Sequence, residues 1–145
     1  MKRSTGLRNY MLATGSFKEA MDGKVIKVYA GTAPASADDA IGAATLLCTI
    51  SVDGTGTGVT FEVAPASGTI SKDTSEIWTG DVVANGTASF FRMLTTADDN
   101  SYSTSAVRMQ GTVGLVGADL HFSSVSLTIG DARRINYFVA SISAG

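Results

Sequence analysis

The sequence contains very little of the chemistry that catalytic and metal-binding sites use. Its 145 residues include one histidine, His121, and one cysteine, Cys48, far apart along the chain. Zinc sites need several such ligands at close spacing, and a nucleophilic triad needs a base beside a serine or cysteine. One cysteine also excludes an internal disulfide, so Cys48 is expected to be a small buried residue. The sequence therefore predicts no catalytic residue, no metal and no cofactor, and the protein is not expected to be an enzyme.

Strong net charge and long apolar runs are also absent. The formal net charge is −2 and the pI is about 5.2, which gives no general attraction to nucleic acid or to an anionic membrane. No apolar run approaches the roughly 18–20 residues of a membrane span, and Met1–Gly15 lacks the apolar stretch of a signal peptide. We therefore expect neither nucleic acid nor membrane as a partner. Lys2, Arg3 and Arg8 are expected to form a solvated arm, with contact to an acidic partner as the alternative.

Small, β-branched and turn-forming residues dominate what is present. The chain has 16 glycines but only 8% aromatic residues, which favours a thin core between sheets. Short strand-like runs recur at a spacing of roughly ten residues, with no long helix between them. The sequence therefore predicts a mainly β protein, an antiparallel, jelly-roll-like β-sandwich of about eight to nine short strands, with a short N-terminal helical segment. Its length predicts a single domain over residues 1–145.

Runs rich in valine, isoleucine, threonine and aromatic residues give the expected strands. These are Lys24–Ala30, Thr45–Val52, Val59–Val63, Thr69–Ile70, Glu76–Val83, Thr87–Thr96, Val107–Leu115, Leu120–Ile129 and Arg134–Ile142. The turns Asp53–Gly58 and Asn85–Gly86 are expected to join their neighbours as hairpins. Alternation in the run from Val107 predicts that Arg108 and Gln110 lie on the solvent face. The apolar run at the C-terminal end indicates a central strand covered on both faces.

The only helical signals lie in residues 1–23. Ser16 followed by Glu19 fits a capping box, and Gly23 supplies the left-handed residue that ends a helix. This predicts a helix over Phe17–Asp22 that is too short to be stable without packing against the rest of the protein. An earlier helical turn of the same apolar character is expected at Leu7, Tyr10 and Met11.

Two short motifs have the letters of ligand sites but are better explained as turns. The glycine-rich run Gly54–Gly58 leads into strand residues and not into the helix that a phosphate-binding loop requires. Asp98–Asn100 lacks the closing glutamate of a calcium loop, so a solvated turn is expected there.

Two further groups leave a ligand-binding alternative open. Carboxylates can pair for glycoside cleavage where a fold brings them together. The candidates are Glu62, Glu76, Asp81 and Asp119. Trp78, with Tyr102 and Tyr137, offers aromatic faces to a sugar ring, although a lone tryptophan in a strand is more often part of the core. His121 lies between apolar residues and is expected to point outward.

Four segments carry a resemblance to a known class of proteins. They are Ser16-Phe17-Lys18-Glu19-Ala20 through Gly23, Val25-Ile26-Lys27-Val28-Tyr29-Ala30-Gly31-Thr32-Ala33-Pro34-Ala35-Ser36-Ala37-Asp38, Leu46-Leu47-Cys48-Thr49-Ile50-Ser51 and Phe90-Phe91-Arg92. Through these segments the chain resembles small virion-associated structural proteins of tailed bacteriophages, over most of its length. The resemblance implies a structural part of a particle, without a catalytic motif, that is assembled in the host bacterial cytoplasm and located in the virion.

The resemblance and the lack of catalytic residues lead to one main hypothesis and two alternatives. The main hypothesis is a capsid decoration or cement protein of the head that forms a homo-oligomer and contacts the major capsid protein or a neighbouring tail protein. The first alternative is a structural protein of the tail or neck, or a surface module that recognises a host glycan or receptor. A small hydrolase is the other alternative, and it would require His121 to be essential.

The N-terminal segment 1–23 is the expected docking element. Aromatic and methionine side chains dominate interface energetics when they fill pockets. The expected interface residues are Leu7, Tyr10, Met11, Leu12 and Phe17. The alternative is that these residues cover the open end of their own sandwich.

Overall fold

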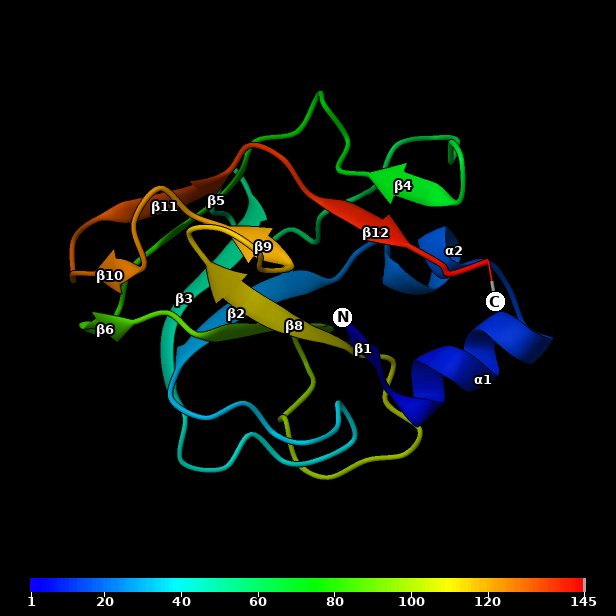
Figure 1. Ribbon diagram of the computed structural model, residues 1–145, viewed down its shortest axis with the longest axis horizontal. Helices are drawn as coiled ribbons and strands as arrows, with labels where there is room; N and C mark the ends of the chain where they lie inside the picture. Colours follow the sequence, from blue (N-terminus) through cyan, green and yellow to red (C-terminus); the bar gives the residue numbers. More distant parts are fainter. Residues whose placement is uncertain (145) are drawn as a thin grey trace.

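The computed structural model describes residues 1–144 and has a mainly β, sandwich-like fold (Figure 1). Its main sheet has eight strands, in the order β1-β8-β7-β2-β3-β5-β11 with β9 paired to β8. The bounds are β1 Lys2–Arg3, β2 Val25–Ala30, β3 Thr45–Val52, β5 Trp78–Asp81, β7 Phe90–Leu94, β8 Met109–Gly114, β9 Leu120–His121 and β11 Ala132–Ile135. The structure confirms the predicted fold class. The β8–β9 pair is parallel, and the other pairs of this sheet are antiparallel.

Two small antiparallel ladders complete the strands. They join β4 (Thr69–Ser71) to β12 (Val139–Ser141), and β6 (Gly86–Thr87) to β10 (Ser126–Leu127). In Figure 1 the main sheet curves, so that its strands β5 and β11, together with the separate β4–β12 ladder, lie across from its central strands β2 and β8. These two parts form the two layers of the sandwich. The long loop between β2 and β3 and the loop between β7 and β8 lie together on the other side of the sheet.

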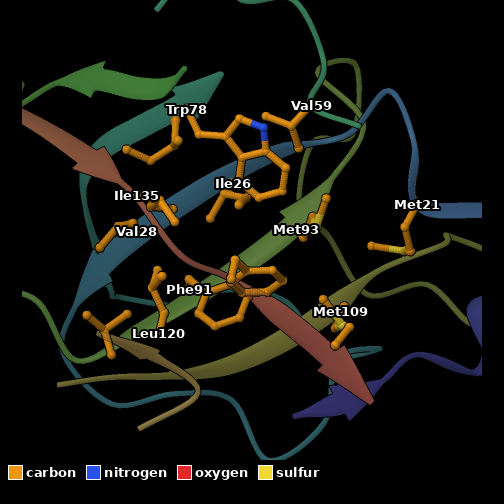
Figure 2. Packing of buried hydrophobic residues seen from close by; sticks show 14 of the residues in the cluster. Met21, Ile26, Val28, Val59, Trp78, Phe91, Met93, Met109, Leu120 and Ile135 are labelled. Carbon is orange, nitrogen blue, oxygen red and sulfur yellow. The ribbon is translucent and has the colours of Figure 1, made fainter. Parts of the chain in front are cut away.

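The apolar core fills the space between the two layers. Figure 2 shows Phe91 of β7 near its centre, with Ile26, Val28 and Met93 on the same sheet around it. The ring centroid of Phe91 lies 5.8 Å from that of Phe138, which precedes β12. Burial of large aromatic rings in such edge-to-face pairs supplies much of the stability of a thin β core.

Two short helices cover one end of this core. They are α1 (Thr5–Ala13) and α2 (Phe17–Met21). The Ser16 hydroxyl accepts a hydrogen bond from the Glu19 amide at 3.0 Å, which is the serine half of the predicted capping box, and Gly23 has a φ of 82° after the helix. The Ser4 hydroxyl caps α1 in the same way through the Leu7 amide. No helix in residues 1–144 has both the length and the apolar character needed to cross a membrane.

The other face of strands β2, β7 and β8 is polar and is also covered. The pairing register places Arg92 opposite Gln110 and Tyr29 opposite Phe90, and all four side chains are buried. The prediction that Arg108 and Gln110 face solvent is therefore wrong, because the loops at 31–44 and 95–106 cover that face. Strand alternation shows which side chains share a face, but it does not show what lies over that face.

Three strand predictions are wrong for a common reason, namely that the partners come from distant segments. Asn85-Gly86 does not close a hairpin, since β6 pairs with β10 and β7 pairs with β2 and β8. Residues 59–63 make only isolated bridges, to Lys24 and Lys72. The expected central strand at 134–142 is divided: β11 forms the edge of the main sheet, and β12 pairs only with β4.

The N-terminal residues do not form the solvated arm that was predicted. β1 pairs with β8, and the Ser4 hydroxyl accepts a hydrogen bond from the Arg108 amide at 2.9 Å. Arg3 donates to the carbonyl of Ser141 at 2.6 Å, and Lys2 donates to the carbonyl of Ala35 at 2.9 Å. The start of the chain is thus attached to β8, to the loop between β2 and β3, and to β12.

Candidate functional site

An apolar groove of about 360 Å³ lies between the start of α2 and the β4–β12 ladder. Residues 16–18, 63, 65, 68–70 and 140–142 line it. Phe17 and Ile70 are buried in its floor, where they are part of the main core. We call this surface the α2 groove. The helix α2 begins at this groove because Ser16 caps it there. Its first residue, Phe17, points toward the core.

The rim of the α2 groove carries apolar side chains that the fold leaves in solvent. Val63 is 88% exposed and Ile142 is also exposed. The one charged group of the lining, the ammonium of Lys18, already bonds to the carboxylate of Asp22 and to the carbonyl of Phe61. The groove therefore offers apolar contacts and no free charge, which suits an apolar segment of another protein better than a polar ligand.

The predicted interface residues divide into two groups. Leu7 and Phe17 are buried in the core, and Tyr10 and Met11 are half-buried against it. These four side chains cover the open end of their own sandwich, which is the alternative that the sequence left open. Leu12 is 84% exposed and is the residue of the set that is free to contact a partner. A docking role for the set stays a prediction.

A buried polar cluster lies on the opposite side of the main sheet from the core. Arg92 donates to Gln110 Oε1 at 2.6 and 3.2 Å, to Asn100 Oδ1 at 3.1 Å and to the carbonyl of Asp39 at 2.8 Å. Asn100 in turn donates to the hydroxyl of Tyr29 at 2.6 Å. Every one of these groups already has a protein partner, so the cluster stabilises the two covering loops and leaves no group free for a ligand.

An ion pair completes this cluster. Arg108 makes two hydrogen bonds of 2.7 Å to the carboxylate of Asp98, from Nε and from a terminal nitrogen. Burial by itself raises the pKa of Asp98, but the hydrogen bonds from Arg108 and from the Asn100 amide outweigh it, so the pKa lies below its usual value. The prediction of a solvated turn at Asp98–Asn100 is therefore wrong in one respect. The segment is a turn, but Asp98 and Asn100 point into the protein.

The groups considered for catalysis do not converge. His121 is exposed, as predicted, and its Nε2 accepts from the Ala118 amide at 3.2 Å. Burial raises the pKa of the Cys48 thiol to about 11, so it is a buried, unreactive side chain as expected. Within residues 1–144 no three His, Cys, Asp or Glu side chains are grouped as metal ligands.

Three of the four carboxylates considered for glycoside cleavage have structural partners of their own, and the fourth, Asp81, is exposed at the end of β5. Glu76 accepts from the amide and hydroxyl of Thr60, at 2.9 and 2.7 Å. Glu62 accepts from the Thr74 amide, and Asp119 accepts from the Thr112 amide. These contacts hold loops in place and indicate no acid and base pair.

Trp78 is not a surface for sugar stacking. Its ring is fully buried, and its Nε1 donates to Glu76 at 2.7 Å. The ring packs edge-on against Phe61 at a centroid distance of 5.8 Å. Of the three aromatic residues considered for sugar binding, only Tyr102 and Tyr137 are exposed.

No protein-family model, curated protein sequence or solved structure matches this chain. The candidate site therefore depends on the geometry described above. Sequence reasoning found Phe17 of the α2 groove but missed Val63, Ile70 and Ile142. These residues come from segments far apart in the chain, and the only local signal was the apolar Val63 beside the turn at Pro65.

Proposed function

We propose that this protein is a structural component of a tailed-phage virion that decorates the head through protein–protein contacts. The observation that carries the proposal is the α2 groove, an apolar surface with an exposed apolar rim. The sequence resemblance to virion-associated proteins points to the same role. The proposed occupant of the groove is an apolar segment of the neighbouring capsid protein.

The lack of convergent reactive groups supports a binding role over an enzymatic one. In residues 1–144 the buried charged and polar side chains serve the fold, as Arg108 with Asp98 and Glu76 with Thr60 illustrate. A protein that works in many copies on a particle needs a rigid body and a contact surface, and it needs no catalytic chemistry. The covered polar face supplies rigidity, and the α2 groove supplies the contact surface.

The N-terminal helices contribute to this role mainly by shaping the groove. Phe17 belongs both to the core and to the groove floor. Leu7 packs into the core beneath α1. Leu12 extends the apolar surface on α1, so we propose that it contacts the capsid beside the groove.

The proposal is tested by co-sedimentation of the purified protein with empty heads of the phage that encodes it. Val63→Asp places a charge on the groove rim, and the 88% exposure of Val63 means that the fold is not disturbed. We expect a loss of at least about tenfold in affinity for heads, because a charge at an apolar contact is left desolvated and unpaired.

Val116→Asp is the matched control. Val116 is 86% exposed, but it lies in the β8–β9 turn and does not line the groove. This variant is expected to bind heads as the parent does. The proposal fails if the parent protein ignores heads, or if Val63→Asp binds as tightly as Val116→Asp. Binding to tails and not to heads would also contradict a decoration role.

A further inference from the structure

A second cavity lies between residues 134–138 and residues 71–76. It has a volume of about 230 Å³ and is lined by Ser71, Lys72, Thr74, Glu76 and residues 134–138. Its floor is apolar because Ile135 and Phe138 belong to the core. Its walls carry hydroxyls, an amide, a guanidinium and a phenol. Polar groups that converge around an apolar floor are typical of sites for small polar ligands. We call it the Tyr137 cavity.

The charged groups at the base of this cavity are already matched by protein partners. Both carboxylate oxygens of Glu76 accept hydrogen bonds, from Thr60 and from Trp78 Nε1. The ammonium of Lys72 donates to the carbonyls of Asp73 and Glu76 and lies over the Trp78 ring, 5.4 Å from its centroid. The opposite charges of Lys72 and Glu76 therefore lie together at the base with hydrogen-bond partners in the protein, and the exposed Arg134 is the other charged residue of the lining.

The groups that remain free are suited to hydroxyls. Within residues 1–144, none of the following side chains makes a salt bridge or a side-chain hydrogen bond to the protein: Ser71, Thr74, Arg134, Asn136 and Tyr137. Together they offer both donors and acceptors, as an amide and hydroxyls do. A ligand that carries several hydroxyl groups can bond to both kinds at once.

Tyr137 adds an apolar surface beside these groups. Its side chain is 76% exposed although it adjoins the apolar floor of the cavity. An aromatic ring in this position is covered favourably by a flat ligand that has an apolar face. A pyranose ring has such a face, formed by its C–H groups, and hydroxyls around its edge.

We propose that the Tyr137 cavity binds a carbohydrate. The pyranose ring stacks on Tyr137, and its hydroxyls bond to Asn136, Arg134 and Thr74 at the cavity walls. This inference goes beyond the proposed decoration role, since the cavity is separate from the α2 groove and its occupancy needs no capsid protein. It also places the carbohydrate contact at Tyr137, after burial has excluded Trp78.

Trp78 serves as a built-in reporter for this site. It is the single tryptophan of the chain, and it contacts two residues that line the cavity, Lys72 and Glu76. A ligand that enters the cavity changes the field around the indole ring and so shifts or quenches its emission. The ring itself stays buried, so the signal reports on the cavity and not on direct stacking.

The test titrates the full chain with glucose, galactose, N-acetylglucosamine, rhamnose and glucuronic acid, and follows Trp78 emission and saturation-transfer NMR. We expect at least one of these sugars to saturate with a Kd on the order of 1 mM, as suits a ligand with few atoms. Tyr137→Ala is expected to weaken that binding at least about tenfold, whereas Tyr137→Phe keeps most of it.

Tyr102→Ala is the matched control, because Tyr102 is 66% exposed and does not line the cavity. It should bind sugar as the parent does, and all three variants should keep the parent melting temperature. The proposal is overturned if no sugar of this panel gives a saturable signal. It is also overturned if Tyr137→Ala and Tyr102→Ala bind equally well. Neither result bears on binding of heads at the α2 groove.

Discussion

On strands β2, β7 and β8, one face carries Ile26, Phe91 and Met109, whereas the opposite face carries Tyr29, Arg92 and Gln110. Both faces are buried. The apolar face only has to be covered by apolar side chains of suitable volume, because dispersion and the hydrophobic effect have no preferred direction. The polar face needs a specific partner for each donor and acceptor, because an unpaired buried polar group costs about 1–3 kcal/mol.

The difference explains why two long loops are ordered on this protein. Arg92 bonds to carbonyls at 36 and 39 in the first loop and to Asn100 in the second. Arg108 bonds to Asp98 in the second loop and to the carbonyl of Ala37 in the first. An apolar face would fix its covering loops less specifically, since apolar contacts tolerate many arrangements. The polar face instead determines where each loop lies.

The largest effect is expected on the apolar face. Phe91→Ala should lower the free energy of unfolding by about 4 kcal/mol, because the change leaves a cavity beside Phe138. The loss should be global, so that far-UV and near-UV circular dichroism report the same transition. A loss below about 1 kcal/mol would show that Phe91 is not a central core residue.

A smaller and more local effect is expected on the polar face. Asp98→Asn should cost about 3 kcal/mol, because it leaves the buried Arg108 guanidinium without its counter-charge. Amide hydrogen exchange should rise first in the loops at 31–44 and 95–106, before the core strands open. If amide hydrogen exchange rose equally in these loops and in all strands of the sheet, the polar and apolar faces would not stabilise separate parts of the protein, and this account would be contradicted.

The same substitution changes the response to acid. The pKa of Asp98 is depressed in the folded state, so its contribution is present above the unfolded pKa of about 3.9 and is lost as the pH falls through the folded pKa. The parent should therefore lose stability below about pH 4 more steeply than Asp98→Asn. Some acid dependence remains in the variant, since the pKa of Asp38 is also lowered, by hydrogen bonds from Thr5 that outweigh its burial.

The smallest effect is expected at the surface of α1. Leu12→Ala should change stability by less than about 0.5 kcal/mol, because its side chain is in solvent. Leu7→Ala, on the same helix, should cost about 2–5 kcal/mol because Leu7 is buried. Thermal denaturation of both variants checks the pair. Equal losses would mean that the helix does not present one face to the core and another to solvent.

Sequence reasoning predicted the apolar face better than the polar one. Strand β3 and the cap at Ser16 were located correctly, because they depend on residues close together in the chain. Arg108 and Gln110 were predicted to face solvent because polar and apolar residues alternate in this strand. Such alternation shows which side chains share a face, but it does not show whether that face is buried. Two loops from distant segments make that face an interior, and no local pattern predicts their position.

The same limit applies to the candidate sites. Asn85-Gly86 has the strongest hairpin signal of the chain, but the Asn85 side chain accepts from the Ile129 amide and the strands pair elsewhere. The α2 groove and the Tyr137 cavity are each formed by segments from both halves of the chain. Tyr137 was one of three aromatic residues considered for sugar contact, but the residues that surround it follow only from the fold.

The central functional claim is tested most directly by cryo-electron microscopy of assembled particles. The proposal predicts density for this sandwich on the outer surface of the head, with the α2 groove turned toward the shell and filled by a capsid segment that contacts Val63 and Ile142. A sandwich whose α2 groove faces solvent, or heads that carry no density for the protein, would contradict it.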